Sequence, residues 1–142
     1  MSWLLDTNVL SELVRPGPNA GLVAWLAERA GEETRLFVSA LTLAEIYRGV
    51  MRLDAGHGRF ARLRSWADRE LPARFAGRIL AFDEQVARSW GAITAALPKG
   101  VNVANMDSLI AATAVHHRLA LVTRNVADMR HFPDLAIENP WR

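Results

Sequence analysis

The stretch that decides the fold is Ser2-Trp3-Leu4-Leu5-Asp6, a short apolar run that stops at a carboxylate. A run of this length bounded by a polar residue is typical of a buried strand. Further short apolar runs follow along the chain, and longer segments with helical periodicity separate them. The sequence therefore predicts strands that alternate with helices.

The pattern assigns most of the chain to one kind of element or the other. We expect strands at residues 2–5, 35–38, 78–82, 119–123 and 136–137, and helices at residues 10–14, 20–30, 58–70, 83–97 and 107–117. A further helix, capped by Ser39 or Thr42, is expected to run to residue 53. The helix over 58–70 is expected to end before Pro72, because proline disrupts a helix interior.

The order of these elements predicts the fold class. Parallel strands need crossover connections, which helices supply, so alternation favours an α/β fold with a parallel sheet covered on both faces. The sequence has no internal repeat and no linker-like segment. We therefore expect one domain that spans residues 1–142.

Composition excludes several classes of protein. Of 142 residues, 51% are hydrophobic and 23% are charged, which excludes a disordered chain. The absence of cysteine excludes disulfides and thiolate chemistry. The N-terminal residues carry no basic export signal, and the apolar run at 109–115 is too short to span a bilayer. We expect a soluble, cytoplasmic protein without a membrane partner.

Positive charge is concentrated in one segment. Residues 48–78 contain eight arginines and three acids, a net charge of +5, whereas the rest of the chain carries −3. Arginine suits bidentate contacts with phosphate. A solvated helix face explains the same pattern. As the candidate nucleic-acid contacts we take Arg48, Arg52, Arg59 and Arg62.

Four carboxylates are placed where the chemistry of such a sheet is expected. Asp6 directly follows the first strand, and Asp128 lies just past the fourth. Glu45 is on the helix after the second strand, and Asp107 opens the helix before the fourth. Ligands of open α/β sheets bind beyond the carboxyl ends of the strands, so these side chains are expected to converge there.

Convergence of these carboxylates favours a metal site. Two carboxylates 4 Å apart repel by about 4 kcal/mol at an effective dielectric constant of 20. A divalent cation removes this cost, and oxygen ligands alone favour Mg²⁺ or Mn²⁺ over zinc. Such an ion can polarise a phosphate and activate water. The chemistry predicted is metal-dependent hydrolysis of a phosphodiester.

Each carboxylate also has a structural interpretation. Asp6 and Asp107 both stand where a helix N-cap is expected. Glu45 and Asp128 have the spacing of a capping box, three residues after Thr42 and Asn125. No single spacing decides between capping and chemistry, and the functional interpretation depends on all four residues together.

Four stretches in order resemble motifs of the PIN domain family, in its VapC- and FitB-like branch. They are residues 4–12 (LLDTNVLSE), 39–49 (SALTLAEIYRG), 107–114 (DSLIAATA), and 121–125 (LVTRN) with Asp128. The tail Asn139-Pro140-Trp141 is also similar to that branch. The resemblance covers essentially the whole chain and implies a three-layer α/β PIN domain, with a mostly parallel sheet of four to five strands flanked by helices.

The resemblance also implies an activity and its residues. It implies a type II toxin that is an Mg²⁺-dependent endoribonuclease, with Mn²⁺ as the alternative ion. The implied acidic pocket consists of Asp6, Glu45, Asp107 and Asp128, among which Asp6 and Asp107 bind metal directly. The residues implied to orient carboxylates and water are Thr7, Asn8, Thr123 and Asn125. The implied partners are an RNA substrate, a cognate antitoxin and a second copy of the chain.

One interpretation of a different class stays open at this stage. In a non-catalytic module, the arginine-rich segment would bind RNA or a protein partner, and the carboxylates would only cap helices. This alternative predicts binding that EDTA does not change and no cleaved product.

Overall fold

The computed structural model describes residues 1–142 and is built on five parallel strands. They are β1 (Trp3–Leu5), β2 (Leu36–Ser39), β3 (Ile79–Leu80), β4 (Ala120–Val122) and β5 (Ile137–Glu138). Their order across the sheet is β3-β2-β1-β4-β5. The order reverses between β1 and β4, which pair in register from Trp3 with Ala120 to Leu5 with Val122. This reversal creates the crevice in which open α/β sheets bind ligands.

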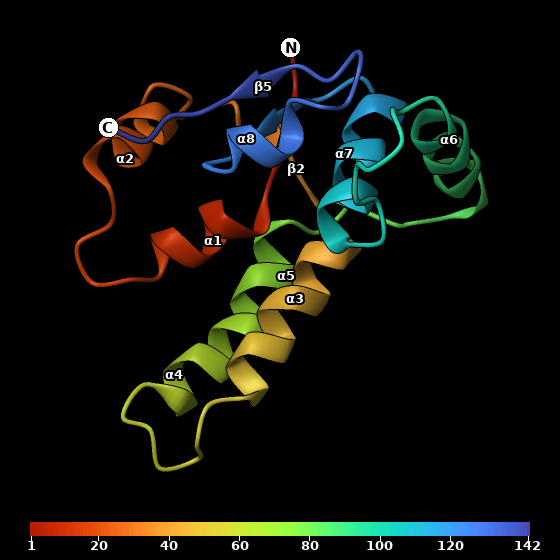
Figure 1. Ribbon diagram of the computed structural model, residues 1–142. Coiled ribbons are helices and arrows are strands. Elements are labelled where there is room, and N and C mark those ends of the chain that lie inside the picture. Colours follow the sequence, from red (N-terminus) through yellow and green to blue (C-terminus); the bar gives the residue numbers. More distant parts are fainter.

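Helices connect the strands and cover both faces of the sheet (Figure 1). They are α1 (Thr7–Leu13), α2 (Ala20–Ala27), α3 (Ala40–Met51), α4 (Phe60–Ser65), α5 (Leu71–Arg74), α6 (Glu84–Ala95), α7 (Met106–His116) and α8 (Val126–Met129). A 3₁₀ turn, Glu33–Arg35, precedes β2. None of the helices is both long enough and apolar enough to cross a membrane. The α/β fold and the parallel, helix-flanked sheet are thus confirmed.

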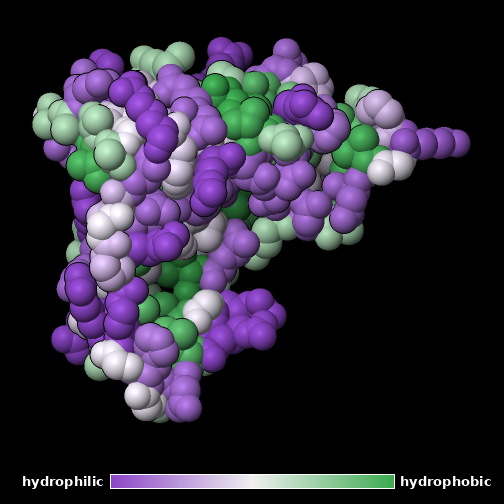
Figure 2. Space-filling view, turned by 60° about the vertical axis from the view of Figure 1, so that its left-hand side comes forward, coloured by the Kyte–Doolittle hydropathy of each residue, from purple (hydrophilic) through white to green (hydrophobic).

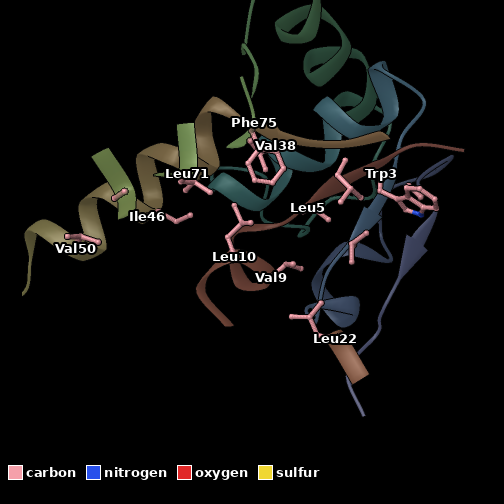
Figure 3. Packing of buried hydrophobic residues seen from close by; sticks show 14 residues of the cluster. Trp3, Leu5, Val9, Leu10, Leu22, Val38, Ile46, Val50, Leu71 and Phe75 are labelled. Atoms are coloured by element: carbon pink, nitrogen blue, oxygen red, sulfur yellow. The ribbon is translucent and has the colours of Figure 1, made fainter. Parts of the chain in front are cut away.

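Alternation along the strands divides the core into two layers, because successive side chains of a strand point to opposite faces. Trp3 and Leu5 pack with side chains from α1, α2, α3 and α5. Leu4, between them, packs on the other face with Ile110 and Ala111 of α7. Figure 3 shows the first layer, in which Leu71 of α5 lies beside Ile46 of α3. Through these residues and Val50 the hydrophobic core extends along α3.

Residues 40–74 form a helical arm that projects from the sheet (Figure 1). Here one expectation is wrong, because the helix predicted to stop before Pro72 continues to Arg74. A π-helical turn, Trp66–Glu70, separates α4 from α5, and the Leu71 amide donates to the Trp66 carbonyl five residues back. Pro72 then lies in the first turn of α5, where its missing N–H costs no helical hydrogen bond.

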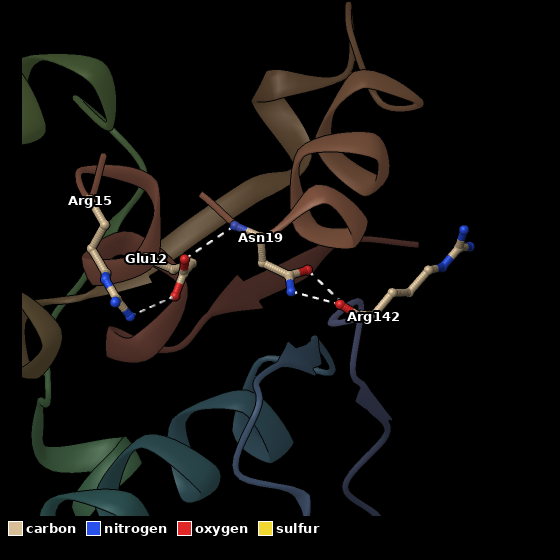
Figure 4. A network of polar contacts seen from close by, with 4 residues as sticks. All are labelled: Glu12, Arg15, Asn19 and Arg142. Atoms are coloured by element: carbon tan, nitrogen blue, oxygen red, sulfur yellow. Dashed lines mark hydrogen bonds and ion pairs between the residues drawn. The ribbon is translucent and has the colours of Figure 1, made fainter. Parts of the chain in front are cut away.

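The C-terminal tail is held against the start of α2 (Figure 4). The Asn19 side chain accepts from the amides of Leu22 and Arg142 at 3.2 Å each and donates to the Arg142 carbonyl at 2.8 Å. Glu12 accepts from the Asn19 amide at 3.1 Å. Gly21 permits this close approach, since a Cβ there would lie 2.3 Å from the Pro140 carbonyl oxygen.

Candidate active site at the carboxyl edge of the sheet

Asp6 is the most deeply buried carboxylate of the chain, with a relative exposure of 2%. Its amide donates to the Val122 carbonyl at 3.0 Å, which places the residue at the crevice between β1 and β4. Its carboxylate accepts from the Thr7 amide at 2.8 Å and so caps α1. Asp6 therefore does cap α1, but the cap occupies only one of its two carboxylate oxygens.

The second oxygen of Asp6 accepts from one residue nearby in the sequence and from one near the other end of the chain. Thr123 Oγ1 donates to Asp6 Oδ2 at 2.8 Å, and Asn8 Nδ2 donates to the same atom at 3.3 Å. Asn8 Nδ2 also lies 3.0 Å from Thr123 Oγ1, which in turn accepts from the Asn125 amide at 2.9 Å. The Thr123 hydroxyl, which is fully buried, thus joins the loops after β1 and β4.

Glu45 reaches this edge of the sheet from α3. The Thr7 hydroxyl donates to Glu45 Oε1 at 2.7 Å and lies 3.2 Å from the hydroxyl of the buried Thr42. Ser39, and not Thr42, caps α3, by accepting from the Leu41 amide at 3.0 Å. The capping-box interpretation of Glu45 is therefore wrong, and its carboxylate remains available at the site.

Asp107 and Asp128 form the other side of the acidic site. Asp107 lies in the first turn of α7, but Asn105 caps that helix, so the capping interpretation of Asp107 is wrong. Asn125 precedes α8 without a side-chain cap and donates from Nδ2 to Asp107 Oδ2 at 3.1 Å. Asp128 is exposed in the first turn of α8.

The charges of these four acids act on one another in pairs. Burial raises the pKa of Asp6 to about 6; the charges of Asp107 and Glu45 act in the same direction, against hydrogen bonds from Thr123 and the Thr7 amide. Burial likewise raises the pKa of Asp107, and the charge of Asp128 adds to the increase. Every carboxylate of the predicted pocket therefore perturbs, or is perturbed by, another one.

The donor set of this acidic site suits a hard divalent cation. It consists of carboxylate, hydroxyl and amide oxygens, without sulfur or imidazole, and such ligands favour Mg²⁺, Mn²⁺ or Ca²⁺. A buried carboxylate with a raised pKa is one that a cation would stabilise in its ionised form. No three acidic or histidine side chains form a closed cage, and Mg²⁺ needs none, because it usually keeps several waters and binds through one or two carboxylates.

The four predicted arginines are all on the arm, but they differ in their contacts. Arg48, Arg52 and Arg62 are exposed and make no side-chain hydrogen bond or ion pair. Arg59 is half-buried, and its guanidinium donates to the Val14 carbonyl at the end of α1. Arg59 therefore ties the arm to the body, a tertiary contact that its spacing in the sequence did not indicate.

The sequence profile of the PIN domain family matches residues 3–135. The chain belongs to the PIN domain family. The PIN domain matched here includes all four carboxylates of the acidic site, and the family resemblance of the sequence motifs is thereby confirmed.

Known PIN domain proteins of similar length resemble the chain throughout. Toxin FitB of Neisseria gonorrhoeae (strain ATCC 700825 / FA 1090) is 41% identical over 139 residues, 97% of each chain. VapC ribonuclease Y4jK of Sinorhizobium fredii (strain NBRC 101917 / NGR234) is 37% identical over 97% of this chain and 96% of its own. The crystal structure of FitAcB from Neisseria gonorrhoeae superimposes with a TM-score of 0.84 at 40% identity, over 98% of both chains.

Proposed function

We propose that this PIN domain is the toxin of a type II toxin–antitoxin pair and that it hydrolyses RNA phosphodiester bonds as an endoribonuclease. The observation that supports this proposal is the acidic site itself. The charges of Glu45 and Asp107 raise the pKa of Asp6, and the charge of Asp128 raises that of Asp107, which supports these four residues, from separate segments, as one acidic site. The toxin and ribonuclease names of the relatives point to the same activity.

Mg²⁺ is the cation we propose for this site, with Mn²⁺ as the alternative. Asp6 and Asp107 would bind it directly, and Glu45 and Asp128 would complete the coordination directly or through water. Bound there, a divalent cation would neutralise the carboxylates and polarise the scissile phosphate and an attacking water.

The polar residues around the carboxylates have their own roles in this proposal. Thr123 and Asn8 hold one oxygen of Asp6, which leaves the orientation of this carboxylate determined before any ligand arrives. Thr7 orients Glu45, and Asn125 orients Asp107, in the same manner. These outer contacts are the kind that tune a metal site. Glu45, which is only half-buried, would accept the proton of the attacking water.

The exposed arginines of the arm would guide the RNA backbone toward the acidic site. Glu45, Arg48 and Arg52 share one face of α3, because they are spaced by three and seven residues. At 1.5 Å per residue, Arg52 lies about 10 Å along the helix axis from Glu45. A phosphodiester chain that lies along this face would meet guanidinium groups before it meets the carboxylates.

An apolar hollow between the arm and the body supports the antitoxin as a protein partner. A cavity of 360 Å³ there is lined mainly by hydrophobic side chains, among them Leu13 of α1, Leu26 of α2 and Leu71 of α5. Figure 2 shows hydrophobic surface in this hollow. Exposed apolar surface with a polar rim is typical of a protein interaction site.

The homodimer, the cytoplasmic location and the one-domain organisation over residues 1–142 stay predictions.

RNA cleavage by the purified protein tests the activity. Wild type is incubated with single-stranded RNA in Mg²⁺ and in EDTA, beside Asp6→Asn and the control Asp134→Asn. Asp134 is exposed and precedes β5, so it lies at the opposite edge of the sheet, and its positive φ of 62° suits asparagine. We expect Mg²⁺-dependent cleavage by wild type and Asp134→Asn and none by Asp6→Asn.

The same experiment distinguishes the proposed nuclease from a non-catalytic binding module. That alternative predicts RNA retained equally in Mg²⁺ and EDTA without product, by wild type and by Asp6→Asn. Cleavage at the wild-type rate by Asp6→Asn would contradict the assigned mechanism. Mass spectrometry of the preparation should accompany a negative result, because a co-purified antitoxin would block the site.

A further inference from the structure

A second cavity adjoins the acidic site on the side of Asp107 and Asp128. It has a volume of 380 Å³ and lies between the loop that precedes α7 and the residues that follow α8. The side chains that define it are Val101, Asn102, Asp107, Asp128, His131 and Phe132. Two of these are carboxylates of the proposed catalytic site, so a ligand in this cavity, the loop cavity, would also touch that site.

The loop that forms one wall of the loop cavity is held in place by hydrogen bonds. Asn102 Oδ1 accepts from the Ala104 amide at 3.1 Å, and Asn105 donates to the Asn102 carbonyl at 3.1 Å. The buried Ser108 hydroxyl donates to the Val103 carbonyl at 2.5 Å and accepts from Trp90 at 2.9 Å. The wall is therefore formed before a ligand arrives.

The loop cavity offers unused hydrogen-bonding groups beside a small apolar wall. The Asn102 amide group, Nδ2, makes no hydrogen bond within the protein, and neither does the imidazole of His131, which is exposed. Phe132 is buried and contributes an apolar wall, with Val101 near it.

This set of groups matches the chemistry of a nucleobase. A base is a flat, weakly polar ring with hydrogen-bond acceptors and donors at its edge, and unpaired bases of single-stranded RNA are recognised by hydrogen bonds to that edge. The volume of the loop cavity is in the lower part of the range of about 300–1,000 Å³ found for small-ligand pockets.

We propose that the loop cavity holds the base of the nucleotide next to the scissile phosphate, and that Asn102 and His131 determine which base is preferred. The inference rests on the proposed ribonuclease function and adds a specificity site to it. His131 donates or accepts at the base edge according to its tautomer, and Asn102 Nδ2 donates. Both residues act on substrate selection and neither takes part in bond breaking.

The test compares cleavage preference among matched variants. Wild type, His131→Ala, Asn102→Asp and His117→Ala are given a pool of short single-stranded RNAs of random sequence in Mg²⁺, and the cleaved ends are sequenced. Asn102→Asp keeps the Oδ1 acceptor for the Ala104 amide but replaces the Nδ2 donor with an acceptor. His117 is the control, because it is an exposed histidine at the C-terminal end of α7, away from the arm and from Asp107 at the start of that helix. Thermal melting confirms that each variant is folded.

We expect wild type and His117→Ala to share one base preference beside the cleaved bond. In His131→Ala and Asn102→Asp, kcat/KM for the preferred base should fall roughly three- to tenfold relative to the other bases, the effect of one lost hydrogen bond. This loss should occur mainly in KM. Unchanged preference in both folded variants, with active wild type, overturns the specificity site and leaves the ribonuclease function standing. A wild-type protein that leaves all RNA intact overturns both.

Discussion

Thr123 Oγ1 donates a 2.8 Å hydrogen bond to Oδ2 of Asp6, and thereby links the ends of β4 and β1 across 117 residues of sequence. The hydroxyl is fully buried, and the same oxygen accepts from Asn8 and Asn125. One threonine thus stabilises the ionised form of a buried carboxylate and joins both loops of the proposed active site.

Removal of this hydroxyl should harm both stability and activity. In Thr123→Val, the side-chain amide of Asn8 and the buried carboxylate of Asp6 each lose a hydrogen-bond partner. The loss should lower the free energy of unfolding by about 1–3 kcal/mol. Loss of the hydrogen bond also raises the pKa of Asp6 further. We expect a lower free energy of unfolding in urea and reduced RNA cleavage.

Thr113→Val is the matched control for this variant. Thr113 is also fully buried, but its hydroxyl only donates to the Leu109 carbonyl within α7, at 2.8 Å. Its replacement should alter stability less and leave cleavage unchanged. Equal effects of the two variants on cleavage would show that Thr123 has no special relation to the acidic site.

The stability of the metal-free protein should depend on the protonation of Asp6. Its pKa is about 6 in the folded protein and about 3.9 in the unfolded chain, so the folded state binds more protons between these values. Stability from this group is therefore full below pH 4 and is lost as the pH rises through 6, by about 2–3 kcal/mol.

Denaturation in EDTA at pH 4.5 and pH 7.5 measures this effect. Asparagine does not ionise, so Asp6→Asn should be more stable than wild type at the higher pH, and the difference should shrink at the lower pH. The difference between the two proteins isolates Asp6 from other acids, including Asp107, whose pKa is also raised. A difference that does not change with pH contradicts the prediction.

The arm arginines should contribute to RNA affinity through phosphate contacts. In an Asp6→Asn background, which binds without cleaving, replacement of Arg48, Arg52 and Arg62 by glutamine should weaken binding of single-stranded RNA. Each lost phosphate contact should reduce the slope of log K against log salt by about 0.7. Binding is measured by fluorescence anisotropy at several salt concentrations.

Two further arginine variants complete that experiment. Arg88→Gln is the control, because Arg88 is exposed on α6 and pairs with Glu84. Arg59→Gln should instead lower the melting temperature, since its guanidinium joins the arm to the end of α1. If replacement of Arg48, Arg52 and Arg62 leaves the slope of log K against log salt unchanged, the arm is not part of the RNA-binding surface.

The apolar hollow should be required for antitoxin binding and not for cleavage. Leu13→Glu places a charge among hydrophobic side chains that line it. We expect this variant to lose affinity for the cognate antitoxin in a pull-down, while its RNA cleavage persists and resists inhibition by added antitoxin. Inhibition equal to that of wild type would place the antitoxin elsewhere on the molecule.

Two glycines that are both in helices should respond in opposite ways to alanine. Gly21→Ala places a Cβ 2.3 Å from the Pro140 carbonyl, so the C-terminal tail must shift, at a cost of about 1–3 kcal/mol. Gly91→Ala meets no atom within 4 Å and should stabilise α6 by about 0.5–1 kcal/mol. Melting temperatures of the two variants test this difference in sign.

Local sequence determined most of the secondary structure and the candidates for the site. The apolar run that ends at Asp6 predicted a strand followed by a carboxylate at its carboxyl end, and the alternation of elements predicted the parallel sheet. These signals are local, since strand and helix periodicity and abrupt polar ends depend on neighbouring residues. The concentration of arginine in residues 48–78 likewise follows from the sequence.

Only the tertiary structure decided which residues meet. The order of the strands depends on the burial of both faces of the sheet at once, and it alone brings Thr123 to Asp6 and Asn125 to Asp107. Tertiary packing also brings the Arg59 guanidinium to the Val14 carbonyl. The arm helix continues past Pro72 because a π-helical turn precedes it. Such contacts join segments distant in sequence or depend on packing against them, so no local pattern specifies them.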